Sequence, residues 1–325
     1  MDNTPPSSPL SSRYAVGAFG KVPKIGDFVR AGLTNEATRA FEEWLHQGVT
    51  YAHEKRGSAW KAPFLAGSIY AFVVQVPLGP DRSRGVAGVL KPSQDSVGRA
   101  FPLAIFAPLS VDMGPQLLLH ALGGFLDEAV VAIDAASRAT SSAEVDAALP
   151  GAVAIADATP LSWHYESWTR ATRLADSWRE IYGSDDVGHP ARALYTLVEM
   201  ARPVREGKVA SVSLGARFPV GTLGVNAAAL WLDLARCAFR STTPPSFFWF
   251  FDGQKGDVFL HLGRPSGSTF TELWCPDPRS ETISDLRASA PQRDLIASLP
   301  PSLQAVLLRG DASVSDLMQA LWFGA

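Results

Sequence analysis

Three short apolar segments follow a long helical pattern near the start of the chain, and this spacing most constrains the fold. The segments cover residues 69–76, 86–90 and 103–107, are rich in β-branched and aromatic side chains, and are bracketed by Gly and Pro. The preceding pattern, over 35–56, places apolar side chains on one helical face. Thr34 or Asn35 is suited to capping the start of this helix, and Gly57 to ending it.

The rest of the chain alternates between helical and strand patterns. A first strand is expected over 14–19 and a loop over 20–32. Helices are expected over 115–138, after Ser141, over 162–182, from Pro190 to Pro203 and over 225–239; strands are expected over 209–214, 246–251 and 258–262. This order predicts an α/β layered fold with a mixed sheet.

The length of 325 residues allows one large domain or two, and 46% hydrophobic residues can form a sizeable core. Residues 1–13 are rich in Pro and Ser without an apolar run, and we expect them to form a disordered leader. Residues 14–276 are predicted to form the α/β domain, with 140–205 as a helical enlargement of it. Residues 277–325, with short helical pieces, are predicted to form a helical C-terminal tail.

Charge and cysteine content argue against several classes of protein. The chain has 29 basic and 32 acidic residues, a net charge of −3, so we expect no nucleic-acid partner. No window reaches 18 consecutive apolar residues, so no membrane insertion is expected and the protein is predicted to be cytoplasmic. Cys237 and Cys275 could pair, but two reduced thiols are the favoured interpretation.

Motifs for catalysis and cofactor binding are mostly absent. Residues 17–21 lack the spacing of a phosphate loop, and no Gly-x-Ser-x-Gly, Cys-x-x-Cys or His-Glu-x-x-His motif occurs. His46 and His53 could share a helix face, but without a third ligand nearby they are interpreted as solvated residues. We therefore expect no catalytic residue, metal or cofactor. A Ser-His-Asp triad built from distant positions stays open, because its members need not be close in sequence.

Two polar loops are the candidate functional segments. The first combines Pro and Gly with a small acidic residue, an apolar side chain and three basic residues. Asp27 is expected to bond nearby backbone N–H groups, Phe28 to pack on the core, and the basic residues to point outward. The members of this loop are Lys21, Pro23, Lys24, Gly26, Asp27, Phe28 and Arg30.

The second loop joins two predicted strands and carries hydroxyl, carboxylate and guanidinium groups. Its members are Pro92, Ser93, Asp95, Gly98, Arg99, Phe101 and Pro102. One interpretation is that both loops are rigid connections, with Asp27 or Asp95 paired to Arg99. The other is that they form a binding site, because ordered polar loops on a rigid scaffold often carry function. A hydrolase or nucleotide-binding enzyme that uses Ser93, Asp95 and Arg99 is the enzymatic alternative.

The two loops resemble the motifs of the TagF (ImpM) family, which is associated with type VI secretion. Gly20-Lys21-x-Pro23-x-x-Gly26-Asp27-Phe28-Val29 is similar to the first motif of that family. Leu90-x-Pro92-Ser93-x-Asp95-x-Val97-Gly98-Arg99-x-Phe101-Pro102-Leu103 is similar to the second. The resemblance covers about residues 14–109, and Lys91 departs from it where an apolar residue is expected.

The resemblance implies a three-layer α/β/α sandwich and a regulator in place of an enzyme. TagF-like proteins are cytoplasmic, post-translational repressors of type VI secretion assembly, thought to bind the forkhead-associated (Fha) scaffold protein. The resemblance therefore implies that partner, or another type VI secretion component, for this chain. A structural accessory subunit of the secretion baseplate is a further alternative.

Overall fold

The computed structural model describes residues 13–324, apart from residues 33, 78–82, 110–112, 208–213, 241–244, 254 and 264. The predicted disordered leader therefore lies outside the described residues, except Arg13, which belongs to the short strand β1 (Arg13–Tyr14) paired with β7 (Val153–Ala154).

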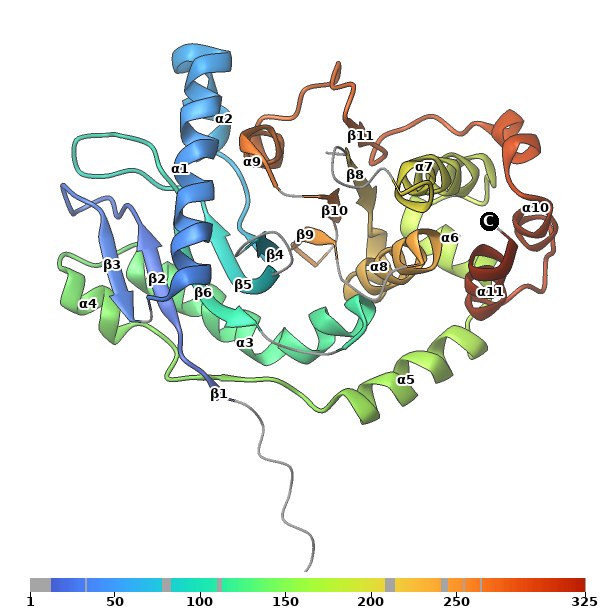
Figure 1. Ribbon diagram of the computed structural model, residues 1–325, viewed down its shortest axis with the longest axis horizontal. Coiled ribbons are helices and arrows are strands. Elements are labelled where there is room, and N and C mark those ends of the chain that lie inside the picture. The colour runs from blue at the N-terminus through green and yellow to red at the C-terminus, as the bar shows by residue number, and fades with distance from the viewer. Residues whose placement is uncertain are drawn as a thin grey trace, which may run out of the picture.

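A nine-stranded mixed sheet forms the centre of the molecule (Figure 1). Its strand order is β11-β8-β10-β9-β4-β5-β6-β2-β3, and every neighbouring pair is antiparallel except β11 with β8. The strands are β2 (Gly17–Gly20), β3 (Val29–Gly32), β4 (Tyr70–Pro77), β5 (Ser83–Lys91), β6 (Leu103–Leu109), β8 (Leu214–Pro219), β9 (Ser246–Phe251), β10 (Gly256–Leu262) and β11 (Ile283–Asp285).

Helices cover both faces of this sheet, so the predicted three-layer α/β/α sandwich is confirmed. One face carries α1 (Glu36–Arg56), α2 (Lys61–Leu65) and α9 (Gly267–Trp274). The other carries α3 (Pro115–Ala136), α4 (Ser142–Ala147), α7 (Gly188–Arg205) and α8 (Val225–Phe239). Around these lie α5 (Ala158–Ala171), α6 (Leu174–Tyr182), α10 (Pro301–Leu307) and α11 (Val314–Gly324). Short 3₁₀ segments occupy Gly57–Trp60, Gly221–Leu223 and Arg293–Ser298.

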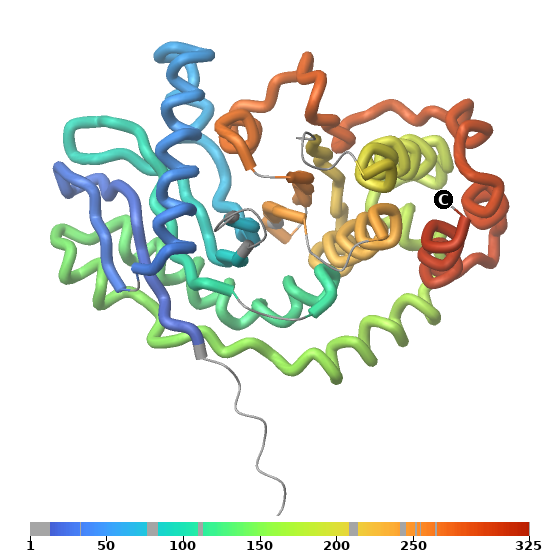
Figure 2. Tube along the Cα trace, viewed as in Figure 1, coloured from blue at the N-terminus to red at the C-terminus, as the bar shows by residue number. Residues whose placement is uncertain are grey.

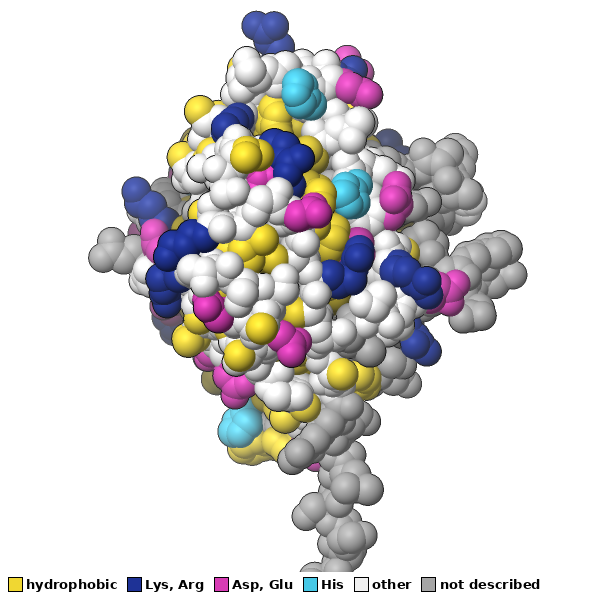
Figure 3. Space-filling model, turned by 90° about the vertical axis from the view of Figure 1, so that its left-hand side faces the viewer, with side chains coloured by type: hydrophobic (Ala, Val, Ile, Leu, Met, Phe, Trp, Pro, Cys, Tyr) yellow, Lys and Arg dark blue, Asp and Glu magenta, His cyan; other side chains and the backbone are white. Residues whose placement is uncertain are grey.

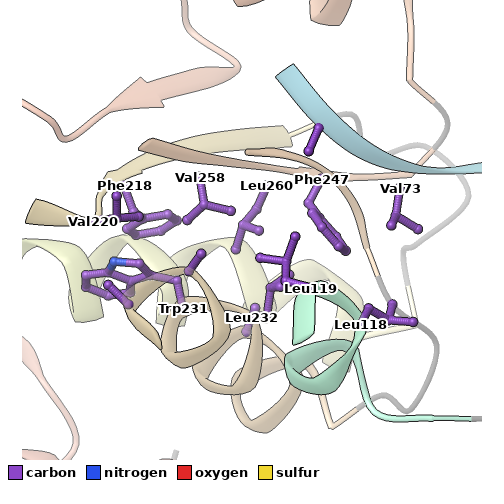
Figure 4. Close-up of a cluster of buried hydrophobic side chains, with 14 of the residues drawn as sticks. Val73, Leu118, Leu119, Phe218, Val220, Trp231, Leu232, Phe247, Val258 and Leu260 are labelled. Atoms are coloured by element: carbon purple, nitrogen blue, oxygen red, sulfur yellow. The ribbon is translucent and has the colours of Figure 1, made fainter. Parts of the chain in front are cut away.

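The apolar alternation of the strands divides the core into two clusters, one on each face of the sheet. On the α8 side, Trp231 stacks on Phe218 with ring centroids 4.6 Å apart and donates its indole N–H to the carbonyl of Pro219 at 2.8 Å. Figure 4 shows side chains of β8, β10, β9 and β4 pointing towards α8 and α3. On the opposite side, Phe41 of α1 stacks on Phe72 of β4 at 4.8 Å.

Helix α3 is long and apolar enough to cross a membrane, and it is the one such helix among the described residues. About half of its apolar stretch, 56%, is buried inside the molecule. Its buried side chains, including Leu118, Leu122 and Phe125, belong to the core cluster beneath β5 and β6. This burial is typical of a core helix in a soluble protein.

Most predicted boundaries are close to the observed ones, and the following elements differ. The expected loop 20–32 contains the edge strand β3. The expected helix 162–182 is two helices, because the backbone at Thr172 and Leu174 bonds to residues 312–314 in place of continuing the helix. Helix α7 begins at Gly188 and contains Pro203, ending two residues later. The expected strand 209–214 lies outside the described residues apart from Leu214, where β8 begins.

The segment 277–325 contains helices, as expected, but it also contributes β11 to the main sheet. A buried ion network holds this addition. Arg287, which follows β11, donates to Asp257 of β10 at 3.2 Å, and Arg217 of β8 lies 3.6 Å from the same carboxylate. The 3₁₀ segment Arg293–Ser298 then packs on α7, and α11 packs on α8. Helix α10 packs on α11, at the end of the molecule opposite β3 (Figure 2).

Alanine substitutions at two helical glycines test this packing, because they should change the free energy of unfolding in opposite directions. A Cβ on Gly48 of α1 would overlap the Phe270 ring of α9, whereas a Cβ on Gly124 of α3 would meet no atom within 4 Å. We expect Gly124→Ala to raise the free energy of unfolding by about 0.5–1 kcal/mol, because alanine lowers the entropy of the unfolded chain. Gly48→Ala should lower it by about 1–3 kcal/mol through overpacking. Urea denaturation of both variants measures this, and a Gly48→Ala variant at least as stable as wild type would contradict the described α1–α9 contact.

Candidate functional site

The two candidate loops lie side by side at one end of the sheet. Residues 21–28 connect β2 to β3, and residues 92–102 connect β5 to β6. Because β2 pairs with β6, with Gly20 opposite Leu103, the loops leave the sheet next to each other. Figure 1 shows both at the left-hand side of the molecule.

The carboxylate of Asp95 joins the two loops. Its Oδ2 accepts hydrogen bonds from Lys21 Nζ and Arg99 Nε, both at 2.6 Å. Its Oδ1 accepts from the backbone N–H groups of Val97 at 3.1 Å and Arg99 at 2.8 Å. The side chain of Asp95 is fully buried, and that of Lys21 is nearly so. A charge removed from water in this way requires partners, and here each carboxylate oxygen has two.

The balance of burial and hydrogen bonding keeps Asp95 ionised. Burial by itself would raise the pKa of Asp95, but the hydrogen bonds from Lys21 and Arg99 outweigh it and hold the pKa well below its usual range. The carboxylate is therefore charged at neutral pH. Its negative charge is shared between two cations, so the group Lys21, Asp95 and Arg99 carries one net positive charge.

Backbone contacts complete the join between the loops. Ser96 N–H donates to the carbonyl of Ile25 at 3.2 Å, and Arg99 Nη2 donates to that of Gly26 at 2.6 Å. Gly20 has a φ of 144°, and a Cβ there would overlap the backbone of Pro102, so the first loop can leave β2 only with glycine at this position. Gly98 has a φ of 82° and donates its N–H to the carbonyl of Asp95 at 2.9 Å, closing the turn.

Aromatic side chains pack beneath and beside the loops. Phe101 is buried, and its ring meets Phe28 edge-on with centroids 4.8 Å apart. Phe28 stacks on Phe19 of β2 at 5.4 Å, with Lys21 Nζ 4.9 Å from the Phe28 ring centroid. His46 of α1 also packs on Phe28, with ring centroids 5.2 Å apart. Phe28 thus packs against the core as expected, while part of its ring stays exposed.

Arg30 forms a second ion pair, on the α1 side of the loops. Its Nε and Nη2 donate to the two carboxylate oxygens of Glu42, at 3.2 and 2.5 Å. These bonds raise the pKa of Arg30, and the guanidinium lies 5.0 Å from the Phe19 ring centroid. The pair fixes the orientation of Arg30 against a helix that begins only six residues later.

The structure overturns one sequence prediction for these loops and decides between the two partners left open for Arg99. Lys21 does not point outward, because the buried carboxylate of Asp95 holds it inside. Arg99 pairs with Asp95 and not with Asp27, whose carboxylate accepts from the adjacent Phe28 N–H at 2.7 Å. The remaining motif positions divide by exposure: Pro23, Lys24, Gly26, Asp27 and Arg30 are exposed, whereas Pro92, Ser93, Phe101 and Pro102 are buried.

Sequence reasoning missed three residues that complete the site. Glu42 pairs with Arg30, His46 packs on Phe28, and Lys61 donates to the carbonyl of Gly98 at 2.7 Å. Glu42 is a buried acidic residue on the apolar face of α1, next to Phe41 and Leu45, and that position was an available signal. Lys91, the departure from the family pattern, pairs with Asp134 of α3 at 2.6 Å.

Three cavities in the described part of the chain lie away from these loops. One of about 850 Å³ lies between the end of α1, α9 and the segment 276–282. Another, of about 330 Å³, lies beside α6 and the end of α10, and a third, of about 190 Å³, lies beside α5. None of their lining residues belongs to either loop. Within the described residues, no group of three His, Cys, Asp or Glu side chains is arranged to hold a metal ion.

Comparison with known families gives this geometry its context. Residues 17–151 match the model of the TagF N-terminal domain, described as type VI secretion system-associated. We call this matched part of the chain the TagF domain. It spans β2 to α4 and contains both loops, so the resemblance predicted from the loop motifs is confirmed.

The TagF domain accounts for one half of the central sheet. Strands β2 to β6 belong to it, and β8 to β11 follow it in sequence. Among solved structures, the chain is similar to PA0076 from Pseudomonas aeruginosa, with 17% identity and a TM-score of 0.46 over 82% of this chain and 96% of that chain. No sequence among curated proteins matches the chain.

The ion group of the TagF domain predicts a measurable dependence of stability on Asp95. Asp95→Asn should lower the free energy of unfolding at pH 7 by about 3 kcal/mol, because it leaves the buried Lys21 without an anionic partner. Asp27→Asn, at an exposed carboxylate, is the matched control and should change it by less than about 0.5 kcal/mol.

The low pKa of Asp95 also predicts how the stability of the protein depends on pH. The folded pKa of Asp95 lies below its unfolded value, so the stability it provides is present above that unfolded value and is lost as the pH falls towards the folded pKa. The difference in free energy of unfolding between wild type and Asp95→Asn should be constant above about pH 5 and shrink as the pH falls from about 4 to 2. Guanidinium denaturation across this range measures it. An Asp95→Asn variant as stable as the Asp27→Asn control would show that the carboxylate does not hold the loops.

Proposed function

We propose that this protein is a non-enzymatic, post-translational repressor of type VI secretion assembly that acts by binding a cytoplasmic component of the apparatus. The observation that carries the proposal is the TagF N-terminal domain, with its secretion-system association, over residues 17–151. The forkhead-associated scaffold is the proposed partner. The two loops, at the free end of the sheet, are the proposed contact.

Repression by binding requires a difference in affinity between two states of the partner. A ligand shifts an equilibrium only by as much as it prefers one state over the other. The repressor must therefore bind the unassembled component more tightly than the assembled one. A loop surface whose geometry is fixed before contact serves this purpose, since little ordering entropy is lost when it binds.

The internal bonding of the loops favours binding over catalysis. Asp95 is the acidic member of the enzymatic alternative. All described hydrogen bonds of its carboxylate go to Lys21, Arg99 and Val97, and the carboxylate is withdrawn from solvent. Its low pKa makes it a weak general base. Ser93 is buried as well. These features support a structural use of the polar groups that a hydrolase would need at its surface.

Measurement of secretion in cells tests the proposal. Deleting the gene should raise export of the tube protein, and overexpressing the protein should lower it, because the amount of free partner changes in opposite directions. Unchanged export in both backgrounds would overturn the proposal. Co-purification with assembled baseplate in place of soluble scaffold would instead favour the accessory subunit.

A further inference from the structure

The two arginine ion pairs of these loops bury the acid and expose the base. The Arg99 side chain is 60% exposed while that of Asp95 is 0% exposed. The Arg30 side chain is 53% exposed while that of Glu42 is 6% exposed. Surface pairs usually expose both partners, as Arg170 and Glu166 of α5 do here. The loops therefore present guanidinium groups to solvent whose counter-charges lie underneath.

Each of these guanidinium groups keeps donors that face solvent. Arg99 uses Nε and Nη2 towards Asp95 and Gly26, and Arg30 uses Nε and Nη2 towards Glu42. A guanidinium has five N–H donors, so several on each arginine stay available. Because the buried bonds fix both groups, they are oriented for a ligand before it arrives.

Other charges near the loops are few. Lys24 is exposed, and Asp27 is the exposed acid of the loop segments. Glu144 of α4, a helix that packs on β3, is a further exposed acid. Within residues 21–32 and 92–102, three of the exposed charged side chains are basic and one is acidic, on a chain whose net charge is −3.

Apolar side chains lie between these cations. Val97 is 71% exposed, and Phe28 is also among the exposed large hydrophobic residues. They lie on adjacent loops, which the bond from Ser96 N–H to the Ile25 carbonyl holds together. Figure 3 views this side of the molecule and shows hydrophobic side chains interspersed with Lys, Arg, Asp and Glu. Ordered loops with exposed apolar groups inside a polar rim are typical of protein interaction sites.

We propose that the surface formed by Lys24, Phe28, Arg30, Val97 and Arg99 binds an acidic segment of a partner protein. Carboxylates of that segment bond the outward guanidinium donors of Arg30 and Arg99, a geometry in which arginine pairs closely with carboxylates. An apolar side chain of the segment covers Phe28 and Val97. This inference rests on the proposed function and adds the chemistry of the partner to it.

Val97 offers a test that separates charge from contact, because no side-chain bond depends on it. Val97→Glu and Val97→Lys both remove the apolar group, but only the glutamate repels an acidic partner. Val131 of α3 is 72% exposed, so Val131→Glu and Val131→Lys are matched controls on another element. Each full-length variant is expressed at graded levels in cells lacking the gene, and tube-protein export is measured. Thermal unfolding of the purified variants checks that they fold.

The measured quantity is the expression level at which export falls to one half. We expect Val97→Glu to raise this level at least about tenfold, and Val97→Lys to raise it less than about threefold. Both Val131 variants should behave as wild type. If wild type represses export and Val97→Glu represses equally well, the surface is wrong while the proposed function stands. Equal loss with Val97→Glu and Val97→Lys overturns the acidic chemistry. If wild type does not repress, the proposed function fails and this inference fails with it.

Discussion

The carboxylate of Asp95 is charged and out of contact with water, and the arrangement of both loops follows from that condition. Its neighbours must supply donors to every side, and they come from both loops: Lys21 from the first, Arg99 and Val97 from the second. A buried pair of this kind adds little net stability compared with an apolar core, but removing one partner is costly. What it provides is a single way for the two loops to fit together.

The sheet makes this arrangement possible, and the second half of the chain makes the sheet stable. Within the TagF domain, β4 ends the set of strands, and its outer edge pairs with β9, which lies outside that domain. Likewise, α3 packs on α8 as well as on β5 and β6, so the later part of the chain covers part of the buried face of the domain's longest helix. The TagF half therefore depends on β8 to β11 and α8 for its hydrophobic burial.

Elements with strong local signals could be predicted from the sequence. Helix α1 begins where Asn35 caps it, with its Oδ1 accepting from Thr38 N–H at 3.0 Å, and strands β4, β5 and β6 follow apolar runs. Strand β3 has only four residues, with Arg and Gly among them, so its pattern is too weak to detect. The break between α5 and α6 is set by bonds to residues about 140 positions later, which no local propensity contains.

The candidate site shows the same limit. The two loop motifs and their family could be found from residue types and spacing, and Arg99 could be paired with Asp95 or Asp27 but not assigned to one of them. The inward direction of Lys21 could not be predicted, because a lysine beside glycines and prolines is ordinarily solvated, and its partner lies 74 residues away. Glu42 and Lys61 join the site only because α1 and the segment after it pack across these loops.

A double-mutant cycle between Lys21 and Asp95 tests most directly whether their charges hold the loops together. Lys21→Met, Asp95→Asn and the double variant are compared with wild type by chemical denaturation at pH 7. We predict a coupling free energy of at least about 2 kcal/mol, with the double variant less destabilised than the sum of the single ones, because it removes both charges from the buried position. Additive effects, within about 0.5 kcal/mol, would contradict the account.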